Sequence, residues 1–505
     1  MMRSLGRDRG LAKTVDWWLV ICWLLLVFIG WGNIYASIHA SEPSSIFDFS
    51  VRSGKQFIWM ITAFTIAGLI LFVIPPRLYE GLSIPIYLFM LGLLVAVIFL
   101  GIEVKGSRSW FAFGPVRFQP AEFSKISTSL LLATVMSQLG YKISRFKDFV
   151  ITALIILIPM MIIVLQSETG SALVYVGFIF MLYREGLSGW LIFMIGMAIL
   201  TFILTLTASP FVAILVLTAV ASLCIYLYSD RFNWWLIICL PILVLFAFLP
   251  SLLEWLTTIT VGAEQLAEIA ALQEAGETVD LPFIMKIKPL YILMGVSLGS
   301  IPFVIYQAFR EGGRFTYLAI LSFIGGILLV FSTNFLFNDV LQDHQRKRIE
   351  VLLGMKEDPT GVGYNVNQSM IAIGSGGLTG KGFLNGTQTT LGFVPEQSTD
   401  FIFCTIGEEW GFIGAAAIIL LYVFLIWRII RNAERSREGF TRIYGYCVAC
   451  CIFMHLFINI GMTIGLMPVI GIPLPFISYG GSSLWGFTAM LFIFIALDRN
   501  ERKYF

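Results

Sequence analysis

Charged residues are scarce in this chain: Asp, Glu, Lys and Arg together make up 13% of its 505 residues. A soluble globular domain carries about 25%, so the composition excludes an ordinary soluble protein. Hydrophobic residues make up 58%, and the mean hydropathy is +0.87. The few charges fall between long apolar runs, and roughly 20 helical residues cross a hydrocarbon core. The runs are continuous rather than alternating, which indicates membrane-spanning helices and argues against a membrane β-barrel.

The chain also lacks the cysteine pattern of an extracellular disulfide framework or of a zinc site. Its seven cysteines lie in or beside apolar runs. Cys447, Cys450 and Cys451 resemble a CxxC motif, but no matching His or Cys cluster completes a metal site. We therefore expect buried, hydrophobic thiols and no resident metal site. A net charge of +2 gives no argument for nucleic acid, and no nucleic-acid partner is expected.

Fourteen apolar segments are candidate membrane spans. They lie near residues 16–36, 56–75, 80–100, 121–140, 148–166, 170–184, 188–207, 210–228, 234–253, 291–309, 316–338, 402–427, 443–466 and 479–497. The first is too long for the apolar part of a signal peptide, and no clear cleavage site follows it. With a cytoplasmic N-terminus, Arg and Lys gather in the even-numbered loops and both tails, as the positive-inside rule requires. The sequence therefore predicts that both termini are cytoplasmic.

Two of the predicted outer loops are long. Residues 254–290 are acidic and rich in Ala and Leu, which is compatible with a surface helix or with a solvated connector. Residues 339–400 combine ionisable residues with many glycines. Long loops without regular structure are uncommon unless they are functional, so the active site is expected in the loop 339–400.

Four carboxylates and a lysine lie in or beside predicted spans, where an ionisable group costs roughly 2.5–3.5 kcal/mol near the bilayer centre. Glu122 and Lys125 are i,i+3 neighbours and can form an ion pair, either as a simple interfacial pair or as a charged lining of a cavity. Glu408 and Glu409 lie inside an apolar run, and at least one should face a cation or a polar cavity. Glu168 lies at an outer turn, where a solvated carboxylate costs little.

The loop 339–400 also contains three adjacent cations at 346–348, followed by Asp358 and a glycine-rich turn. A basic run at a membrane interface is often a lipid-headgroup contact. The same cations could offset the charge that develops on a leaving diphosphate, and a nearby carboxylate could take a proton from an attacking sugar hydroxyl. Composition alone does not choose between these interpretations.

The motifs in this region resemble those of a known family. Residues 345–414 read QRKRIEVLLGMKEDPTGVGYNVNQSMIAIGSGGLTGKGFLNGTQTTLGFVPEQSTDFIFCTIGEEWGFIG. This string resembles the signature region of the SEDS family of cell-wall polymerases, and its RodA-like branch more closely than its FtsW-like branch. Residues 107–125, 166–172 (QSETGSA) and 461–483 (GMTIGLMPVIGIPLPFISYGGSS) resemble three further family motifs in the same order. The resemblance extends from the first outer loop to the last span.

The resemblance implies an inverting peptidoglycan glycosyltransferase that polymerises lipid II into glycan strands and releases undecaprenyl pyrophosphate. It implies a multi-pass protein of the bacterial inner membrane with an extracytoplasmic active site, acting in cell elongation and shape maintenance. The implied partners are a class B penicillin-binding protein, which is a transpeptidase, and other membrane proteins of the elongation machinery. The RodA-like form of the motifs favours cell elongation over cell division.

By position, Asp358 matches the family's essential loop aspartate, and we assign it the role of general base. Lys125 and Arg348 are assigned to phosphate, and Trp110 to a sugar face or an acyl chain. The full set of residues expected to bind substrate is Arg108, Trp110, Glu122, Lys125, Arg348, Gln368, Thr387, Gln388, Glu396, Asp400 and Ser478. No dedicated metal-ligand motif is present, so no cofactor is assigned, although a divalent cation (Mg²⁺ or Mn²⁺) near Glu408, Glu409 or the pyrophosphate stays open.

The chain departs from the family in two ways. Glu168 and Ser171 stand where the family usually has Asp and Thr, which leaves any fine role of that segment open. Fourteen spans exceed the ten that are typical, so we expect an all-α polytopic bundle with a ten-helix core and about four inserted helices. The expected division is an N-terminal core at 1–208, an insert at 209–315 and a C-terminal core at 316–505. A partner-docking surface is one hypothesis for the insert.

Two other function classes fit parts of the same evidence. A lipid II flippase would also use intramembrane charges such as Lys125 and Glu408, but it needs a polar path through the bilayer. A non-catalytic scaffold for the penicillin-binding protein is compatible with the sequence as well. The predicted location of Asp358, Arg348, Glu122 and Lys125 at one face of the membrane favours the polymerase.

Overall fold

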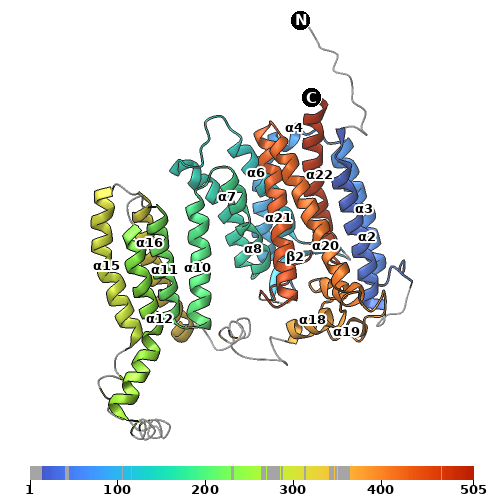
Figure 1. The fold of residues 1–505 in the computed structure, drawn as a ribbon. Helices are drawn as coiled ribbons and strands as arrows, with labels where there is room; N and C mark the ends of the chain where they lie inside the picture. Colours follow the sequence, from blue (N-terminus) through green and yellow to red (C-terminus); the bar gives the residue numbers. More distant parts are fainter. Residues whose placement is uncertain are drawn as a thin grey trace. The chain divides into compact units, whose positions relative to one another are not determined.

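The computed structural model describes residues 14–39, 45–104, 106–114, 116–228, 233–262, 265, 269, 282, 285, 288–311, 314–340, 346, 350, 364–467 and 469–504. The chain forms two compact units (Figure 1). The first unit combines Met1–Ser188 with Glu357–Phe505, and the second is Gly189–Lys356. Each unit has its own hydrophobic core.

The first unit is a bundle of apolar helices with a few short elements at its ends. Its long helices are α2 (Trp17–His39), α3 (Arg52–Phe72), α5 (Ser83–Leu100), α6 (Pro120–Met136), α7 (Phe146–Leu165), α20 (Ile402–Arg435), α21 (Gly439–Thr463) and α22 (Gly481–Tyr504). Its shorter helices are α4 (Arg77–Gly81), α8 (Thr169–Val176), α9 (Phe178–Arg184), α18 (Tyr364–Ser375) and α19 (Thr387–Thr390).

Helices α6, α21 and α22 form the centre of the first unit. Helix α6 packs against α5, α7, α21 and α22, and almost all of its residues are buried. It begins at Pro120, whose missing N–H is tolerated at the first position of a helix. Most of α21 and α22 is buried too, whereas α3, α5 and α7 keep large apolar faces exposed. Exposed apolar faces on helices of this length fit a hydrocarbon environment.

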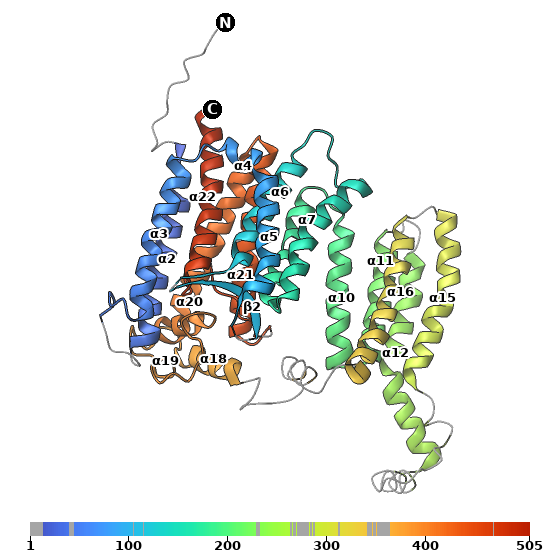
Figure 2. The same cartoon turned by 180° about the vertical axis from the view of Figure 1, so that it is seen from behind.

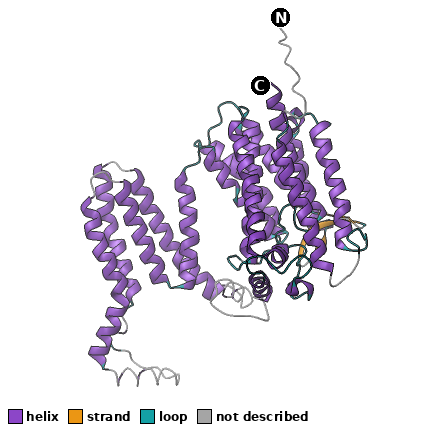
Figure 3. Cartoon of the chain, turned by 45° about the vertical axis from the view of Figure 1, so that its right-hand side comes forward, coloured by secondary structure: helices purple, strands orange, loops and turns teal. Residues whose placement is uncertain are grey.

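The two ends of the first unit differ in structure. One end, here called the terminal end, contains the start of α2 and the last turn of α22 (Figures 1 and 2). At the opposite end lie α18, α19 and a small antiparallel sheet of β1 (Ile102–Val104), β2 (Ser107–Phe113) and β3 (Val116–Phe118) in the order β1-β2-β3. We call this the sheet end. Figure 3 shows helices nearly everywhere else in the described part of the chain.

The second unit is also helical. It contains α10 (Gly189–Thr207), α11 (Pro210–Tyr228), α12 (Asn233–Val261), α15 (Pro289–Glu311), α16 (Arg314–Phe335) and the π-helical turn η1 (Leu336–Val340). Helix α16 packs against α10, α11 and α15. The buried core of this unit includes Ile214 and Leu217 on α11 and Phe323 and Val330 on α16.

The all-α polytopic fold is confirmed, and every one of the fourteen predicted segments is helical. Within the described residues, ten helices are long and apolar enough to cross a membrane, and three apolar helices are shorter. The remaining segment, α6, contains Glu122 and Lys125 and is 17 residues long. The chain is therefore a multi-pass membrane protein. The small sheet was not predicted, because its strands are only three to seven residues long.

The three-part division expected from the sequence stays a prediction. The second unit contains the expected insert 209–315 and extends beyond it at both sides, because α10 and α16 pack with the inserted helices. Most of the acidic stretch 254–290 beyond α12 lies outside the described residues, as do residues 351–363 of the loop 339–400.

Candidate active site at the sheet end

A buried ion pair stands at the start of α6. Lys125 Nζ lies 2.8 Å from Glu122 Oε1, and both side chains are almost completely inaccessible to solvent. The i,i+3 pairing predicted from the sequence is confirmed, and the pair is buried within the protein. Glu122 Oε2 accepts no hydrogen bond within the described part of the chain. The pair therefore retains one unsatisfied carboxylate oxygen in a buried site.

Lys125 has a second partner on α21. Its Nζ lies 2.8 Å from His455 Nε2 and 5.0 Å from the ring centre of Phe487 on α22. His455 Nδ1 lies 3.0 Å from the carbonyl oxygen of Pro473. One ammonium group thus joins three helices through an ion pair, a hydrogen bond and a cation–π contact. His455 was not among the predicted site residues, because nothing in its local sequence indicates a partner 330 positions away.

Glu168 lies next to this group, in the turn between α7 and α8. Its Oε1 accepts hydrogen bonds from Gln119 Nε2 and from Ser171 Oγ, the latter at 3.1 Å, while its Oε2 is buried and has no hydrogen-bond partner in the described chain. Burial raises the pKa of Glu168, and hydrogen bonds from Ser109 and Ser171 oppose that rise only in part. The residue is half-buried, but its Oε2 atom is fully buried, so the carboxyl group is less solvated than an outer turn suggests. Its Gln119 partner directly precedes α6.

The predicted loop residues Arg108 and Trp110 both lie on β2. Arg108 is exposed, and its Nε lies 3.7 Å from Glu103 Oε2 on β1, which is its cross-strand neighbour. Trp110 is half-buried opposite Ile102. The sheet therefore presents Arg108 at the surface and not in the buried Glu122–Lys125 group.

A second buried carboxylate organises the loop after α18. Glu408 near the start of α20 is fully buried, and its Oε1 lies 2.7 Å from Lys381 Nζ. It also accepts hydrogen bonds from the backbone N–H groups of Gln388 and Thr389 at 2.8 and 2.9 Å, and from the Thr387 hydroxyl at 3.2 Å. The prediction that one of these glutamates faces a cation is confirmed for Glu408.

These contacts show where two predicted substrate-binding residues lie. Thr387 through its hydroxyl and Gln388 through its backbone hold Glu408, and both belong to the four-residue helix α19. Lys381 Nζ also lies 2.6 Å from the Thr387 hydroxyl. The segment 381–389 is thus fastened to α20 by a single buried carboxylate. Lys381 was missed in the sequence because it lies 27 residues from Glu408, outside any helical spacing.

A second set of hydrogen bonds joins the segment before α20 to the segment before α22. The hydroxyl of Ser478 donates to the carbonyl oxygen of Thr399 at 2.6 Å and accepts from the Leu474 N–H at 2.8 Å. The carbonyl oxygen of Asp400 accepts from Asn459 Nδ2 at 2.8 Å, and Glu396 Oε2 accepts from the Thr399 hydroxyl at 3.1 Å. The predicted residues Glu396, Asp400 and Ser478 therefore lie together.

The remaining predicted residues cannot all be placed. Asp358 and Arg348, the expected general base and phosphate ligand, lie outside the described residues. Gln368 is half-buried on α18. No cluster of three or more His, Cys, Asp or Glu side chains that could hold a metal ion occurs among the residues that the structure describes, and the Glu408 carboxylate is already surrounded by protein donors.

The comparisons with known proteins agree with this architecture. A family model described as "Cell cycle protein", which covers FtsW, RodA and SpoVE, matches residues 16–233 and 281–503. The unmatched residues between them fall inside the second unit.

Two relatives carry names that describe an activity. Peptidoglycan glycosyltransferase RodA of Treponema pallidum is 29% identical over 500 residues, covering 98% of this chain and all of that protein. Peptidoglycan glycosyltransferase MrdB of Escherichia coli is 29% identical over 412 residues, covering 81% of this chain and 76% of that protein.

Solved structures have the same fold. A chain from a peptidoglycan synthase complex matches with a TM-score of 0.58 at 22% identity, covering 96% of this chain and 98% of that one. The crystal structure of RodA from Thermus thermophilus matches with a TM-score of 0.50 at 20% identity, covering 97% and 98%. Because the family model covers most of the chain, this protein belongs to the FtsW/RodA/SpoVE family.

Proposed function

We propose that this protein polymerises lipid II into glycan strands, with Asp358 as the general base. The enzyme class follows from the family, whose relatives over most of the chain are named peptidoglycan glycosyltransferases. The observation that carries the placement of the reaction is the position of α18. This helix begins at Tyr364, six residues after Asp358, and it lies at the sheet end of the first unit. Six residues span at most about 20 Å, which supports the proposal that Asp358 acts at that end.

The proposed reaction requires one base and several cations. Asp358 accepts the proton of an acceptor sugar hydroxyl as that oxygen attacks the anomeric carbon of the donor. The new C–O bond forms while the bond to the pyrophosphate oxygen breaks, which inverts the configuration. Arg348 and Lys125 are the proposed cations for the negative charge on the departing undecaprenyl pyrophosphate. Arg108, Trp110 and Gln368 are proposed to contact the sugars or the lipid chain from β2 and α18.

The proposed topology places the sheet end outside the cell. Arg428, Arg435, Arg437, Arg499 and Arg502 gather at the terminal end, and basic residues favour the cytoplasmic side. Both termini are then cytoplasmic in a bacterial inner membrane, and the active site is extracytoplasmic. Among the described residues of the first unit, the buried charges lie toward the two ends: Glu122, Lys125, Glu408 and Glu409 at one, and Asp16, Asp498 and Glu501 at the other. This distribution favours a polymerase over a flippase, which needs a continuous polar path.

The proposed partner is a class B penicillin-binding protein, together with other membrane proteins of the elongation machinery. The support for it is the matched chain, which comes from a peptidoglycan synthase complex that coordinates polymerisation and crosslinking.

The test uses purified full-length protein, with and without the transpeptidase, and labelled lipid II. Glycan strands should form with the wild type, and Asp358→Asn should slow their formation at least about 100-fold, the lower range for loss of a general base. Asp48→Asn, the same substitution in the exposed loop before α3, is the matched control and should retain activity. Glycan formed equally well by Asp358→Asn would remove Asp358 from this role. Lipid II translocation without glycan would instead support the flippase, and neither activity would support a scaffold.

A further inference from the structure

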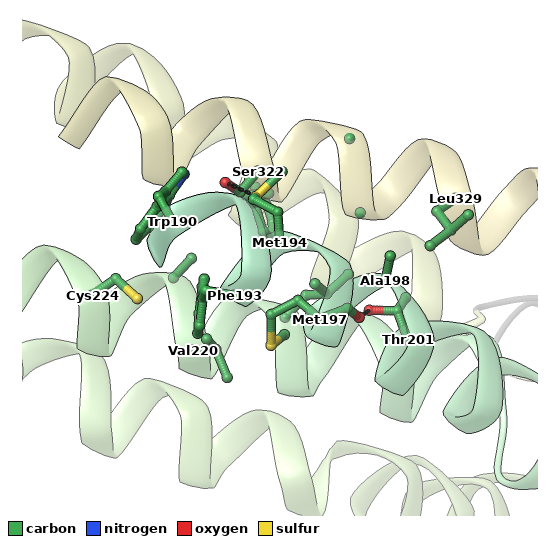
Figure 4. Close-up of a pocket in the computed structure, with 15 residues that line it drawn as sticks. Trp190, Phe193, Met194, Met197, Ala198, Thr201, Val220, Cys224, Ser322 and Leu329 are labelled. Carbon is green, nitrogen blue, oxygen red and sulfur yellow. Dashed lines mark hydrogen bonds between the residues drawn. The ribbon is translucent and has the colours of Figure 1, made fainter. Parts of the chain in front are cut away.

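The second unit contains a pocket between α10, α11 and α16 that has no part in the proposed reaction. Its volume is about 260 Å³. Figure 4 shows side chains of all three helices around it, with Trp190 and Cys224 toward one end and Thr201 and Leu329 toward the other. All lining residues belong to this one unit, so its shape does not depend on how the two units are arranged.

The lining residues form a stripe on each of the three helices. On α10 the stripe includes Trp190, Phe193, Met197 and Thr201, which recur at helical spacing. Eleven residues separate Trp190 from Thr201, which corresponds to about 16 Å along the helix axis. The pocket is therefore an elongated channel parallel to the helices. This length is close to one leaflet of a hydrocarbon core that is about 30 Å thick in total.

The polar groups of the lining are already satisfied. The Thr201 hydroxyl donates to the carbonyl oxygen of Met197 at 2.6 Å, and the Ser322 hydroxyl donates to Met194 Sδ at 2.6 Å. Nearly all of the remaining lining is aliphatic, aromatic or thioether surface. A buried water needs two to four polar partners, and these walls do not supply them. The pocket therefore suits hydrocarbon and not water or a polar ligand.

Small residues on α16 keep the channel open. A Cβ added at Gly325 would meet no atom within 4 Å, whereas one at Gly326 would lie 2.8 Å from the side chain of Leu217. Gly325 lines the pocket and is exposed, so a larger side chain has room there. An unfilled space deprives its walls of dispersion contacts. Of the helices that bound it, α10 and α16 contain segments long and apolar enough to cross a membrane, and α11 is a shorter apolar helix.

From this geometry we propose that the channel between α10, α11 and α16 binds one acyl chain of a glycerophospholipid from the surrounding membrane. The length of one leaflet, the dry lining and the width left by Gly325 fit a single unbranched chain. A polyprenyl chain has a methyl branch on every isoprene unit and fits a narrow channel less well. The site is separate from the proposed lipid II chemistry, so either can fail without the other.

The test is photolabelling of the full-length protein in nanodiscs that contain a phospholipid with a diazirine in its acyl chain. Labelled positions are identified by peptide mass spectrometry. We expect labels on peptides that contain Met194, Met197 or Leu217. Gly325→Leu should fill the channel and reduce these labels at least fivefold. Gly295→Leu on α15 is the matched control: a Cβ there also meets open space, the gain in helix propensity is the same, and labelling should not change.

Two further measurements keep the proposal falsifiable. If Gly325→Leu does not give a monodisperse protein, Ala221→Leu fills the same channel from α11 and should have the same effect. In detergent, added phospholipid should raise the Tm of the wild type but not that of the filled variant. Equal labelling of the wild type and the filled variants would overturn the site. Channel labelling only by a polyprenyl phosphate probe would overturn the assignment to an acyl chain.

Discussion

Lys125 Nζ lies 2.8 Å from His455 Nε2, and this contact fixes the protonation pattern of the histidine. An ammonium group has donors only, so Nε2 must accept. Nδ1 must then carry the proton and donate it to the Pro473 carbonyl oxygen at 3.0 Å. A neutral imidazole thus connects the ammonium group to the segment between α21 and α22. The hydrogen bond to His455 and the 2.8 Å contact to Glu122 together fix the position of the Lys125 side chain.

Two substitutions of His455 should therefore distinguish its role in positioning Lys125 from its role in side-chain packing. His455→Leu removes the acceptor and leaves a buried donor unpaired, which should lower the free energy of unfolding by about 1–3 kcal/mol and reduce glycan synthesis. His455→Gln keeps a side-chain oxygen that can accept from Lys125, so it should recover most of the activity. The measurements are Tm and the initial rate of polymerisation across lipid II concentrations. Equal activity of the Leu and Gln variants would show that the acceptor is unimportant.

The Glu408–Lys381 contact predicts strong coupling between two residues in different elements. Lys381→Met leaves a buried carboxylate without its cation, and Glu408→Gln leaves the lysine without its anion. The double variant Glu408→Gln/Lys381→Met should be less destabilised than the sum of the two, with a coupling free energy of about 0.5–3 kcal/mol. Thermal unfolding of the four proteins measures this coupling.

A matched pair at the same end provides the control for that cycle. Arg108 and Glu103 are exposed, and their closest atoms are 3.7 Å apart, so the cycle Arg108→Met/Glu103→Gln should show coupling below about 1 kcal/mol. Additive effects at Glu408 and Lys381 would contradict the role assigned to the buried pair.

The sequence indicated the membrane-spanning helices and local pairs, but not the long-range contacts. Hydropathy located all fourteen helical segments, and helical spacing alone predicted the Glu122–Lys125 pair. The expectation that Glu408 or Glu409 faces a cation or a polar cavity could not identify Lys381, because loop geometry sets that contact. Thr387 and Gln388 were expected to bind substrate, and the structure shows their contacts to Glu408. The burial of the Glu168 Oε2 atom was missed because the local sequence of an outer turn gives no sign of it.

The backbone conformation and close packing at position 411 of α20 require a glycine. Its φ of 64° and ψ of −162° interrupt the helix, and a Cβ there would lie 2.3 Å from the backbone nitrogen of Gly380. Gly411→Ala combines left-handed strain with a backbone clash, and we expect a loss of about 3 kcal/mol or more. Gly374→Ala on α18, where a Cβ meets open space, should be neutral or slightly stabilising. Similar Tm values for both variants would contradict this expectation.

The hydrogen bonds of Asp16 at the terminal end predict that the stability of the folded protein depends on pH. Desolvation by burial opposes its ionisation, but hydrogen bonds from Asn432, Arg428 and Arg502 outweigh that effect and lower the pKa of Asp16 below 3.8. Because the pKa is lower in the folded state, ionised Asp16 stabilises the fold fully above its unfolded-state pKa. This stabilisation is lost as the pH falls through the folded-state pKa.

Asp16→Asn should therefore be less stable than the wild type at pH 7, by about 3 kcal/mol for a broken buried ion pair. The difference should shrink as the pH falls below about 4, where the carboxylate of the unfolded chain is protonated. Thermal unfolding in detergent at pH 7, 5 and 3 measures it. Asp148→Asn, in the first turn of α7, is the control, because Asp148 is only half-buried and its carboxylate accepts from the Lys142 N–H. A constant difference at all three pH values would contradict the assignment.

For Glu168 we expect the opposite pH dependence of stability from that of Asp16. Burial raises its pKa above the ordinary value of 4.5, so the folded state binds the proton more tightly than the unfolded chain does. Below pH 4.5 the carboxyl group is neutral in both states, and burial carries no charge penalty. As the pH rises through the raised pKa, the folded state must hold a buried anion whose Oε2 has no hydrogen-bond partner among the described residues, and stability falls.

Glu168→Gln, which keeps an oxygen to accept from Gln119 and Ser171, should therefore unfold at a higher temperature than the wild type at pH 8 and at about the same temperature at pH 4. Ser171→Ala separates charge from hydrogen bonding, because it removes a donor that stabilises the ionised form and should lower the Tm more at pH 8 than at pH 4. If the Gln variant were less stable than the wild type at pH 8, Glu168 would have to be ionised and paired in the folded protein, contrary to the burial seen here.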